Sequence, residues 1–253
     1  MVSTLASEAA AMSDTELAAR TAELAGRLLM QIRADRLLTG AAAGDAGDLL
    51  ANGLILAALR TWRPGDAILS EETDDDLARL GRARVWVVDP LDGTREYAEG
   101  TDDWSVHVAL AMNGVPVAGA VALPARGRLF RSDRVNRPLE HKRALRMVVS
   151  RSRTPSEAAA LARAIGAQLV PMGSAGAKAM AVVSGDADIY YHSGGQSEWD
   201  NCAPAAVALA AGLHVSRADG SPILYNCADV AVPDLIICRR ALASRLIEAV
   251  KRL

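Results

Sequence analysis

The sequence predicts an α+β fold, in which helices and mostly antiparallel strands share one chain of 253 residues. Apolar residues make up 51% of the chain, which is enough to build a large buried core and argues against disorder. Apolar positions near the N-terminus recur at helical spacing. Apolar runs between residues 104 and 130 are instead separated by short turns, which predicts an antiparallel meander and not a series of β-α-β units.

The composition argues against several classes of partner. A net charge of −2 and an aromatic content of 4% disfavour binding of a nucleic-acid polymer. No stretch of about 18 apolar residues predicts a membrane span, and Glu8 and Asp14 lie where a signal peptide would be basic or apolar. Cys202, Cys227 and Cys238 lack metal-ligand spacing and predict buried free thiols in a reducing compartment. We therefore expect a cytoplasmic protein with no membrane or nucleic-acid partner.

Two helices are predicted before the first strand. Residues 14–36 have an amphipathic pattern, and Asp14 can cap that helix. A loop rich in glycine and alanine is expected at 39–47, followed by a second helix at 49–59. Asp48 lies where an N-cap belongs, so it is either a plain N-cap or an acid directed at a site from a helix start.

The most informative stretch is an apolar run that ends in two acids. Residues 85–88 predict a buried strand, which Pro90 is expected to end because proline lacks the N–H that a ladder requires. Gly93 allows a tight turn. Asp89 and Asp92 would then face one point, where their repulsion favours a cation such as Mg²⁺ between them. A polar turn without any ligand is the alternative.

The remaining elements divide into two predicted lobes, residues 1–145 and 146–253, joined by a basic connection at 131–146. In the first lobe, a short strand at 67–70 precedes Glu71, and Asn113-Gly114 predicts a hairpin turn. The second lobe is expected to have strands at 146–150, 167–171, 188–191, 213–215 and 235–238, helices at 157–165, 175–184, 201–211 and from 241, and a glycine-rich loop at 192–197, with Pro204 in the first turn of its helix.

Acids recur at predicted strand ends and helix starts. One such acid is an ordinary cap, but several from separate segments predict a pooled carboxylate cluster that binds more than one metal ion. The acids are Asp48, Glu71, Asp89, Asp92 and Asp200.

Four motifs, in this order along the chain, resemble the inositol monophosphatase superfamily. They are Glu71-Glu72, Asp89-Pro90-Leu91-Asp92-Gly93-Thr94, Gly173-Ser174-Ala175 and Glu198-Trp199-Asp200-Asn201-Cys202-Ala203-Pro204. The resemblance implies a five-layer αβαβα sandwich, a homodimer, and a lithium-sensitive phosphomonoesterase with two or three Mg²⁺ ions per active site. Lys178, the segment after Asp200 and residues 224–226 resemble the CysQ-like 3'(2'),5'-bisphosphate nucleotidases within it.

The resemblance also implies roles for individual residues. Glu71, Asp89 and the carbonyl of Leu91 would hold the first metal, and Asp89, Asp92 and Asp200 would hold the second. Asp48 and Thr94 would orient the attacking water, with Glu71 also catalytic, and the N–H groups of Gly93 and Thr94 would bind the phosphate. The rest of the substrate would be bound by Asp92, Gly173, Ser174, Lys178 and Asp200.

The nucleotidase resemblance implies removal of the 3'-phosphate from 3'-phosphoadenosine 5'-phosphate, giving AMP, in sulfur assimilation. Hydrolysis of inositol 1-phosphate or fructose 1,6-bisphosphate is the first alternative, and a catalytically silent, metal-binding regulatory dimer is the second. Arg151 and Arg153 are either cations for a second phosphate or solvated surface charges. His107 and His192 are isolated histidines and are expected to be structural, because one histidine is not a ligand set.

Overall fold

The computed structural model describes residues 12–138 and 143–253 as helices and strands in mixed order. The helices are α2 (Asp14–Asp35), α3 (Gly40–Trp62), α4 (Thr94–Ala98), α5 (Ala158–Ile165), α6 (Ala175–Val183), α7 (Glu198–Ala210) and α8 (Arg240–Val250), with short 3₁₀ turns η1 (Ala78–Gly81) and η2 (Pro124–Arg126). The strands are β1 (Ala67–Ser70), β2 (Arg84–Asp92), β3 (Ser105–Met112), β4 (Val115–Leu123), β5 (Arg128–Arg131), β6 (Leu145–Ser150), β7 (Ala167–Met172), β8 (Ile189–Ser197), β9 (His214–Ser216) and β10 (Ala231–Cys238).

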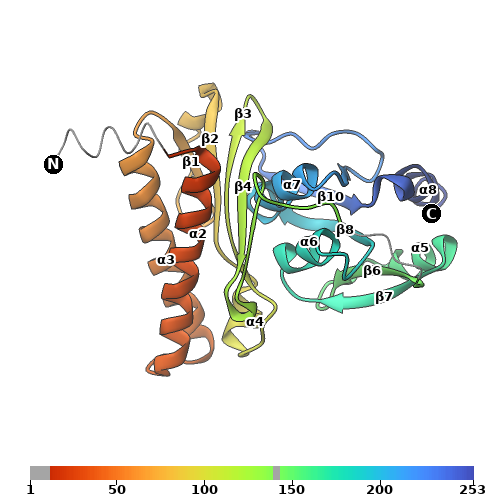
Figure 1. Cartoon of the computed structure of the whole chain (residues 1–253), viewed down its shortest axis with the longest axis horizontal. Helices are drawn as coiled ribbons and strands as arrows, with labels where there is room; N and C mark the ends of the chain where they lie inside the picture. The colour runs from red at the N-terminus through yellow and green to blue at the C-terminus, as the bar shows by residue number, and fades with distance from the viewer. Residues whose placement is uncertain (1–11, 139–142) are drawn as a thin grey trace.

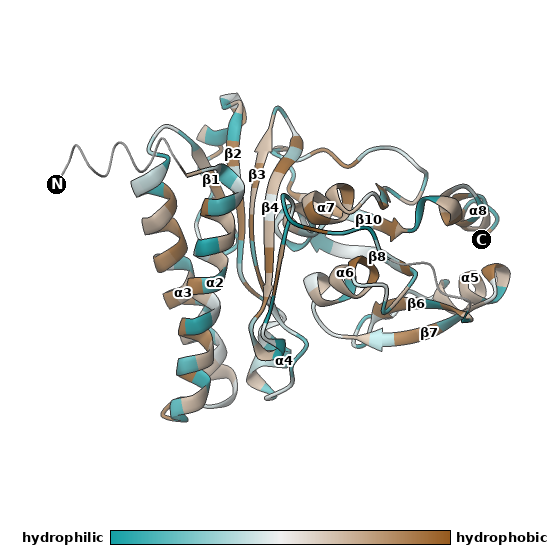
Figure 2. Cartoon of the chain, in the orientation of Figure 1, coloured by the Kyte–Doolittle hydropathy of each residue, from teal (hydrophilic) through white to brown (hydrophobic). Residues whose placement is uncertain are grey.

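These elements form five layers (Figure 1). Helices α2 and α3 cover the outer face of the first sheet, α6 and α7 lie between the two sheets, and α5 and α8 cover the outer face of the second. The five-layer αβαβα sandwich that the family resemblance implies is therefore confirmed. Hydrophobic residues run along β2 to β4 and along the middle helices, whereas α2 and α3 alternate between hydrophobic and hydrophilic positions (Figure 2).

The strand order brings several carboxyl ends to one place. The first sheet has the order β1-β2-β3-β4-β5, with β1 parallel to β2 and the rest antiparallel, so the predicted meander is confirmed. Its hairpin turn has Asn113 at φ 50° and Gly114 at φ 80°. The second sheet has the order β7-β6-β8-β10-β9, and β6 is parallel to both β7 and β8. The chain therefore leaves β6, β7 and β8 at the same edge.

The middle layer is built from small residues. On the first sheet, a Cβ atom added to Gly119 would lie 2.7 Å from the Cβ of Ala206 and 3.2 Å from the carbonyl oxygen of Ala203 on α7. One apolar cluster contains Val121 from the first sheet and Leu235 from the second. The layers are thus in continuous contact, and the division into lobes 1–145 and 146–253 stays a prediction.

The prediction of a loop at 39–47 is wrong, because α3 begins at Gly40 and residues 40–47 are helical. Asp48 lies inside this helix and is not an N-cap. Two glycines explain the error. A Cβ on Gly44 would lie 2.9 Å from Thr94 Cγ2, and one on Gly47 would lie 2.9 Å from Leu29 Cδ2. These glycines let the helix pack closely, and they do not mark a turn.

Two strands are longer than predicted. Strand β2 does not end at Pro90: it continues to Asp92 through an irregularity in register between Asp89 and Asp92. Proline is tolerated at such a bulge because one residue there is left out of the ladder. The glycine-rich segment 192–197 belongs to β8 and is not a loop, because it pairs with β10 with a further shift in register.

Two smaller expectations are also corrected. The cap of α2 is Ser13, whose hydroxyl accepts a hydrogen bond from the N–H of Glu16, and Asp14 is already helical. Pro204 lies inside α7 and not in its first turn, because the helix begins at Glu198.

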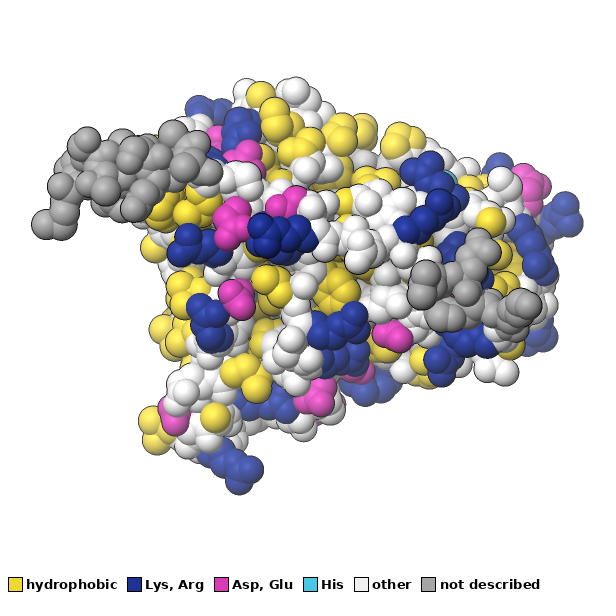
Figure 3. Space-filling view, in the orientation of Figure 1, with side chains coloured by type: hydrophobic (Ala, Val, Ile, Leu, Met, Phe, Trp, Pro, Cys, Tyr) yellow, Lys and Arg dark blue, Asp and Glu magenta, His cyan; other side chains and the backbone are white. Residues whose placement is uncertain are grey.

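Two further expectations from the sequence concern buried free thiols and the lack of a membrane-spanning stretch. Cys202, Cys227 and Cys238 are free thiols, but Cys227 is partly exposed and not buried. By length and composition alone, α3 could cross a membrane, and half of its apolar window is buried in the protein. This is weak evidence, since core helices pass the same test. Basic, acidic and hydrophobic side chains are interspersed over the face shown in Figure 3.

Candidate active site

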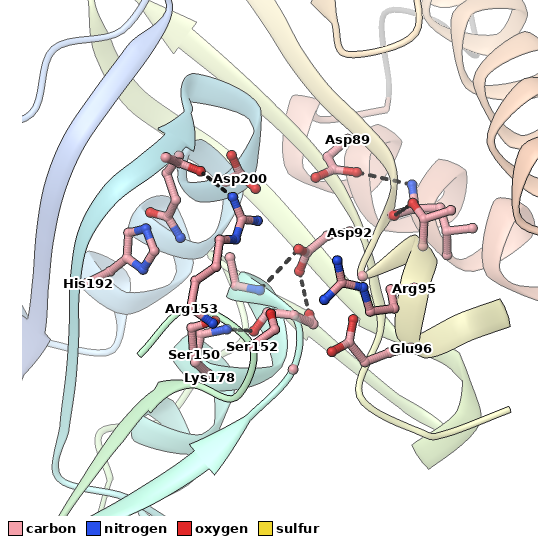
Figure 4. A pocket seen from close by; sticks show the side chains of 18 of the residues that line it. Asp89, Asp92, Arg95, Glu96, Ser150, Ser152, Arg153, Lys178, His192 and Asp200 are labelled. Atoms are coloured by element: carbon pink, nitrogen blue, oxygen red, sulfur yellow. Dashed lines mark hydrogen bonds between the residues drawn. The ribbon is translucent and has the colours of Figure 1, made fainter. Parts of the chain in front are cut away.

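A polar pocket of about 220 Å³ opens where the carboxyl ends of strands from both sheets meet. Figure 4 shows the side chains that line it. One side, which we call the acidic wall, consists of Glu71, Asp89, Asp92 and Asp200. The opposite side, which we call the second-sheet wall, consists of Ser150, Ser152, Arg153, His192 and Gln196.

The acidic wall draws on three elements. Glu71 directly follows β1, Asp89 and Asp92 lie at the irregular end of β2, and Asp200 lies in the first turn of α7. Oxygen atoms of Asp89, Asp92 and Asp200 all lie within 4.8 Å of one another. The structure therefore brings together acids that are far apart in the sequence, as their positions at predicted strand ends and helix starts indicated.

The surroundings of most of these acids raise their pKa values and so favour the protonated form. Burial, together with the charges of Glu71 and Asp92, raises the pKa of Asp89 well above its usual value. Partial burial and neighbouring carboxylates also raise the pKa values of Glu71 and Asp200 to about 7. An all-oxygen donor set under this repulsion fits a hard divalent cation, which would favour the ionised forms.

Asp92 is the exception, because α6 and β3 donate to it. Burial would raise its pKa, but the charges of His107 and Lys178 and its hydrogen bonds lower the pKa below the usual value. The donors to its carboxylate are the N–H groups of Ala175 (3.0 Å) and Gly176 (2.8 Å) and the hydroxyl groups of Ser105 (2.8 Å) and Ser174.

This arrangement changes the interpretation of the α6 start. The family resemblance implies that Gly173 and Ser174, at the start of α6, contact the substrate, but in the structure the Asp92 carboxylate accepts hydrogen bonds from the first N–H groups of this helix. Gly173 and Ser174 do line the pocket beside it. Their role in substrate binding stays a prediction.

Ser105 and His107 were missed as site residues. His107 is fully buried, and its Nε2 atom lies 2.9 Å from the Ser105 hydroxyl and 3.4 Å from Asp92 Oδ2. Strand register explains this position, since Asp89 pairs with His107 and Asp92 with Ser105. Two polar residues at alternate positions of an apolar strand were the available signal, because such residues share one face.

Thr94 lines the pocket and forms a second group with Asp48, which is outside the lining. The Thr94 hydroxyl lies 3.1 Å from Asp48 Oδ2 and 3.0 Å from the carbonyl oxygen of Leu91. The other carboxylate oxygen of Asp48 is buried without a hydrogen-bond partner. Burial and the charge of Glu72 raise the pKa of Asp48 to about 7. Asp48 therefore has an unused acceptor and a pKa suited to proton transfer.

The turn between Asp92 and Thr94 requires glycine. Gly93 has φ 91°, a left-handed conformation that other residues rarely adopt. A Cβ atom there would lie 2.9 Å from the carbonyl oxygen of Asp103 and 3.3 Å from Cβ of Ser174. The close approach keeps the turn against the start of α6.

The cations of the site differ in their surroundings. Lys178 is 4% exposed, and its ammonium donates to the carbonyl oxygen of Ser174 at 2.5 Å. Burial lowers its pKa to about 8. Arg151 is not part of the pocket lining and is paired with Glu96 at 3.1 Å, whereas Arg153 lines the pocket.

Comparison with known proteins identifies the family. The sequence profile described as "Inositol monophosphatase family" matches residues 13–253. The chain belongs to the inositol monophosphatase family. The carboxylate cluster in the structure agrees with the metal dependence of this family.

Relatives within the family carry more specific names. The chain is 50% identical over 240 residues to a "3'-phosphoadenosine 5'-phosphate phosphatase" of Mycobacterium bovis, which covers 89% of both chains. It is 48% identical to a protein of the same name in Mycobacterium leprae, covering 96% of this chain and 95% of the relative. It is 33% identical to the "3'(2'),5'-bisphosphate nucleotidase CysQ" of Salmonella typhimurium, covering 72% and 78%.

Solved structures agree with the fold of this family member. CysQ from Bacteroides thetaiotaomicron has 28% identity and a TM-score of 0.79, covering 90% of this chain and 98% of that one. The inositol monophosphatase of Anabaena has 23% identity and a TM-score of 0.74, with 94% of each chain covered, and shows the shared fold alone.

Proposed function

We propose that the chain is a Mg²⁺-dependent phosphatase that removes the 3'-phosphate from 3'-phosphoadenosine 5'-phosphate (PAP), giving AMP and phosphate in sulfate assimilation. The observation that carries this proposal is 48–50% identity, over most of both chains, to proteins named as phosphatases of this compound. The acidic wall and the Asp48–Thr94 pair supply the groups that such a hydrolysis needs.

Two or three Mg²⁺ ions are proposed for the acidic wall. Glu71, Asp89 and the Leu91 carbonyl would hold the first, and Asp89, Asp92 and Asp200 the second. The fit rests on the oxygen donors, on the raised pKa of Asp89 and on the unpartnered oxygen of Asp48. When bound, the ions would supply positive charge for the transferring phosphoryl group and lower the pKa of water.

Thr94 and Asp48 are the proposed groups for activating water. The Thr94 hydroxyl donates toward Asp48 Oδ2, so its oxygen can accept a hydrogen bond from a water molecule in the pocket. Asp48, with a pKa of about 7, can take the proton that this water loses. The backbone N–H groups of Gly93 and Thr94 are proposed to bind the phosphate oxygens.

The remaining predicted contacts concern the rest of the substrate. Lys178 lines the pocket as a buried cation and is proposed to balance the charge of a bound phosphate. Gly173 and Ser174 are proposed to contact substrate hydroxyl groups, as are Asp92 and Asp200. Because Asp92 already accepts several hydrogen bonds, its contribution there would be fixed in position before substrate binds.

The test is phosphate release from a panel of esters by the purified protein with Mg²⁺. The panel contains PAP, inositol 1-phosphate and fructose 1,6-bisphosphate, with Asp92→Asn run in parallel. PAP should have the highest kcat/KM, and the variant should lose most activity. A strong preference for inositol phosphate defeats the nucleotide assignment. Hydrolysis of no ester favours a catalytically silent regulatory protein.

We also propose a cytoplasmic homodimer. The homodimer rests on the family resemblance, and the location is supported by three free cysteines. Size-exclusion chromatography with light scattering measures the mass, and a monomer at micromolar concentration would contradict the proposal.

A further inference from the structure

The loop after β6 reaches the pocket from the side opposite Asp89. Parallel pairing of β6 with β7 and β8 brings the ends of these strands to one edge, where Ser150 and Ser152 line the pocket with Arg153. Figure 4 shows Arg153 between Asp200 and the two serines. Three hydrogen-bond donors therefore come from one short segment.

Arg153 is held in place by this loop and by β8. Its N–H donates to the Ser150 hydroxyl at 3.1 Å, and the Thr154 hydroxyl donates to the Ser150 carbonyl at 2.5 Å. Its guanidinium donates to the carbonyl oxygen of Gly195 at 3.4 Å. A Cβ atom on Gly195, which has φ 74°, would lie 3.2 Å from Arg153 Nη1, so glycine leaves the room that the guanidinium uses.

The charge of Arg153 is not neutralised by a neighbour. Among the described residues, no carboxylate lies within ion-pair distance of Arg153, although its charge acts to lower the pKa of Asp200. Arg151, two residues earlier, is instead paired with Glu96 at 3.1 Å and Asp103 at 3.7 Å. Burial lowers the pKa of His192 to about 4, so this neighbour is uncharged at neutral pH. Arg153 is thus an available cation in a polar pocket.

We propose that Arg153, with the hydroxyl groups of Ser150 and Ser152, binds the second, uncleaved phosphate of a nucleoside bisphosphate. A guanidinium can donate two parallel hydrogen bonds to a phosphate, and serine hydroxyls can donate to its remaining oxygens. The acidic wall would repel a phosphate without bound cations, whereas the second-sheet wall would attract one. This inference rests on the proposed function and adds the group that selects bisphosphates over monophosphates.

The test compares PAP with adenosine 3'-monophosphate, which has the same cleaved phosphate but lacks the second one. Purified, Mg²⁺-loaded protein should prefer PAP in kcat/KM. Arg153→Met should lower the ratio of the two kcat/KM values by about 10- to 100-fold, mainly through the KM for PAP. Arg153→Lys should recover part of the preference, because it restores the charge but not the planar donors.

One matched control variant and one binding measurement complete the design. Arg151→Met should keep the preference of the wild type, since Arg151 does not line the pocket and its guanidinium is already paired with Glu96 and Asp103. Calorimetric titration with AMP, which retains the uncleaved phosphate, should show a weaker Kd for Arg153→Met than for Arg151→Met.

Several outcomes would overturn the inference. PAP hydrolysis with an unchanged preference in Arg153→Met removes only this inference and leaves the proposed function standing. Arg95 of α4 also lines the pocket, so a lost preference in Arg95→Met but not in Arg153→Met would place the second phosphate at α4. If the wild type hydrolyses another ester and not PAP, the proposed function fails as well.

Discussion

The two walls of the pocket differ in how their charges are balanced. On the acidic wall, Asp89 is buried among other carboxylates, and its pKa is raised well above the usual value. On the second-sheet wall, Arg153 is exposed to solvent and has no carboxylate within ion-pair distance among the residues described. The acidic wall therefore needs bound cations to stabilise its ionised carboxylates, whereas the second-sheet wall offers a cation, unpaired among the described residues, that can bind an anion.

The contrast between Asp92 and Asp89 shows that position in the chain does not decide this behaviour. Both acids lie on the same strand end, yet Asp92 has a lowered pKa and Asp89 a raised one. The difference comes from α6, whose N-terminal N–H groups donate to Asp92. These hydrogen bonds from α6 to Asp92 thus connect the acidic wall to the middle helical layer.

Asp89→Asn should have the largest effect. Because Asp89 is the proposed ligand shared by both metal positions, the amide should lower kcat/KM by at least about 1,000-fold, measured as phosphate release. Asp74→Asn is the matched control, since Asp74 is an exposed acid outside the pocket. Near-normal turnover by Asp89→Asn would contradict the acidic wall as a metal site.

Metal removal should make stability depend on pH in an unusual direction. Glu71, Asp48 and Asp200 have pKa values of about 7 when folded but about 4 when unfolded, so the folded protein binds more protons between these values. Their contribution to the stability of the metal-free protein therefore falls as pH rises from about 4 to 7.

Mg²⁺ should reverse that loss. It should raise Tm by more than about 3 °C at pH ~8, and by less at pH ~5.5, where protons compete for the carboxylates. Thermal unfolding with EDTA and with Mg²⁺ at both pH values measures this. An equal Tm increase at the two pH values would speak against carboxylate ligands with raised pKa values.

Gly176→Ala tests the attachment of Asp92 to α6. A Cβ atom on Gly176 would overlap His107 Nε2 and the Ser105 hydroxyl, so we expect a loss of about 1–3 kcal/mol in the free energy of unfolding. Gly53→Ala is the matched control in α3, where a Cβ atom meets nothing within 4 Å, and it should stabilise by about 0.4–1 kcal/mol. Urea unfolding of both variants should give changes of opposite sign.

Inhibition by Li⁺ is the smallest expected effect. Li⁺ is close to Mg²⁺ in size and carries half its charge, so it should occupy the position proposed between Asp92 and Asp200 without stabilising the transition state equally well. Phosphate release should fall with added Li⁺ and depend on the Mg²⁺ concentration. Full activity in Li⁺ would argue against a second metal position there.

Much of the fold could be predicted because local patterns and tertiary packing agree. The Asn113-Gly114 turn and the strand at 67–70 were found in place. Glycine caused the errors at 39–47 and 192–197, because composition alone does not distinguish a turn from close packing. Gly44 and Gly47 are needed where α3 packs against Thr94 and Leu29.

The sequence indicated the acids of the site but not the residues that hydrogen-bond to them and position them. Acids at strand ends are visible in a sequence, and the family motifs add their roles. His107 was indicated only by its alternation with Ser105 along an apolar strand, and its place beside Asp92 depends on strand register. The donors of α6 to Asp92 could not be found, because they depend on how two distant elements pack. The distinct surroundings of Arg151 and Arg153 were likewise invisible, since adjacent loop residues can point in different directions.

The contact between Gly119 and Ala206 has a consequence for the width of the pocket. The backbone of β4 at Gly119 meets only the methyl group of Ala206 and the backbone of Ala203 on α7, so small residues set the distance between the first sheet and the middle helical layer. A larger side chain at Gly119 would act as a spacer and push the two rims of the cleft apart. Turnover would then fall although no residue that touches the ester had changed.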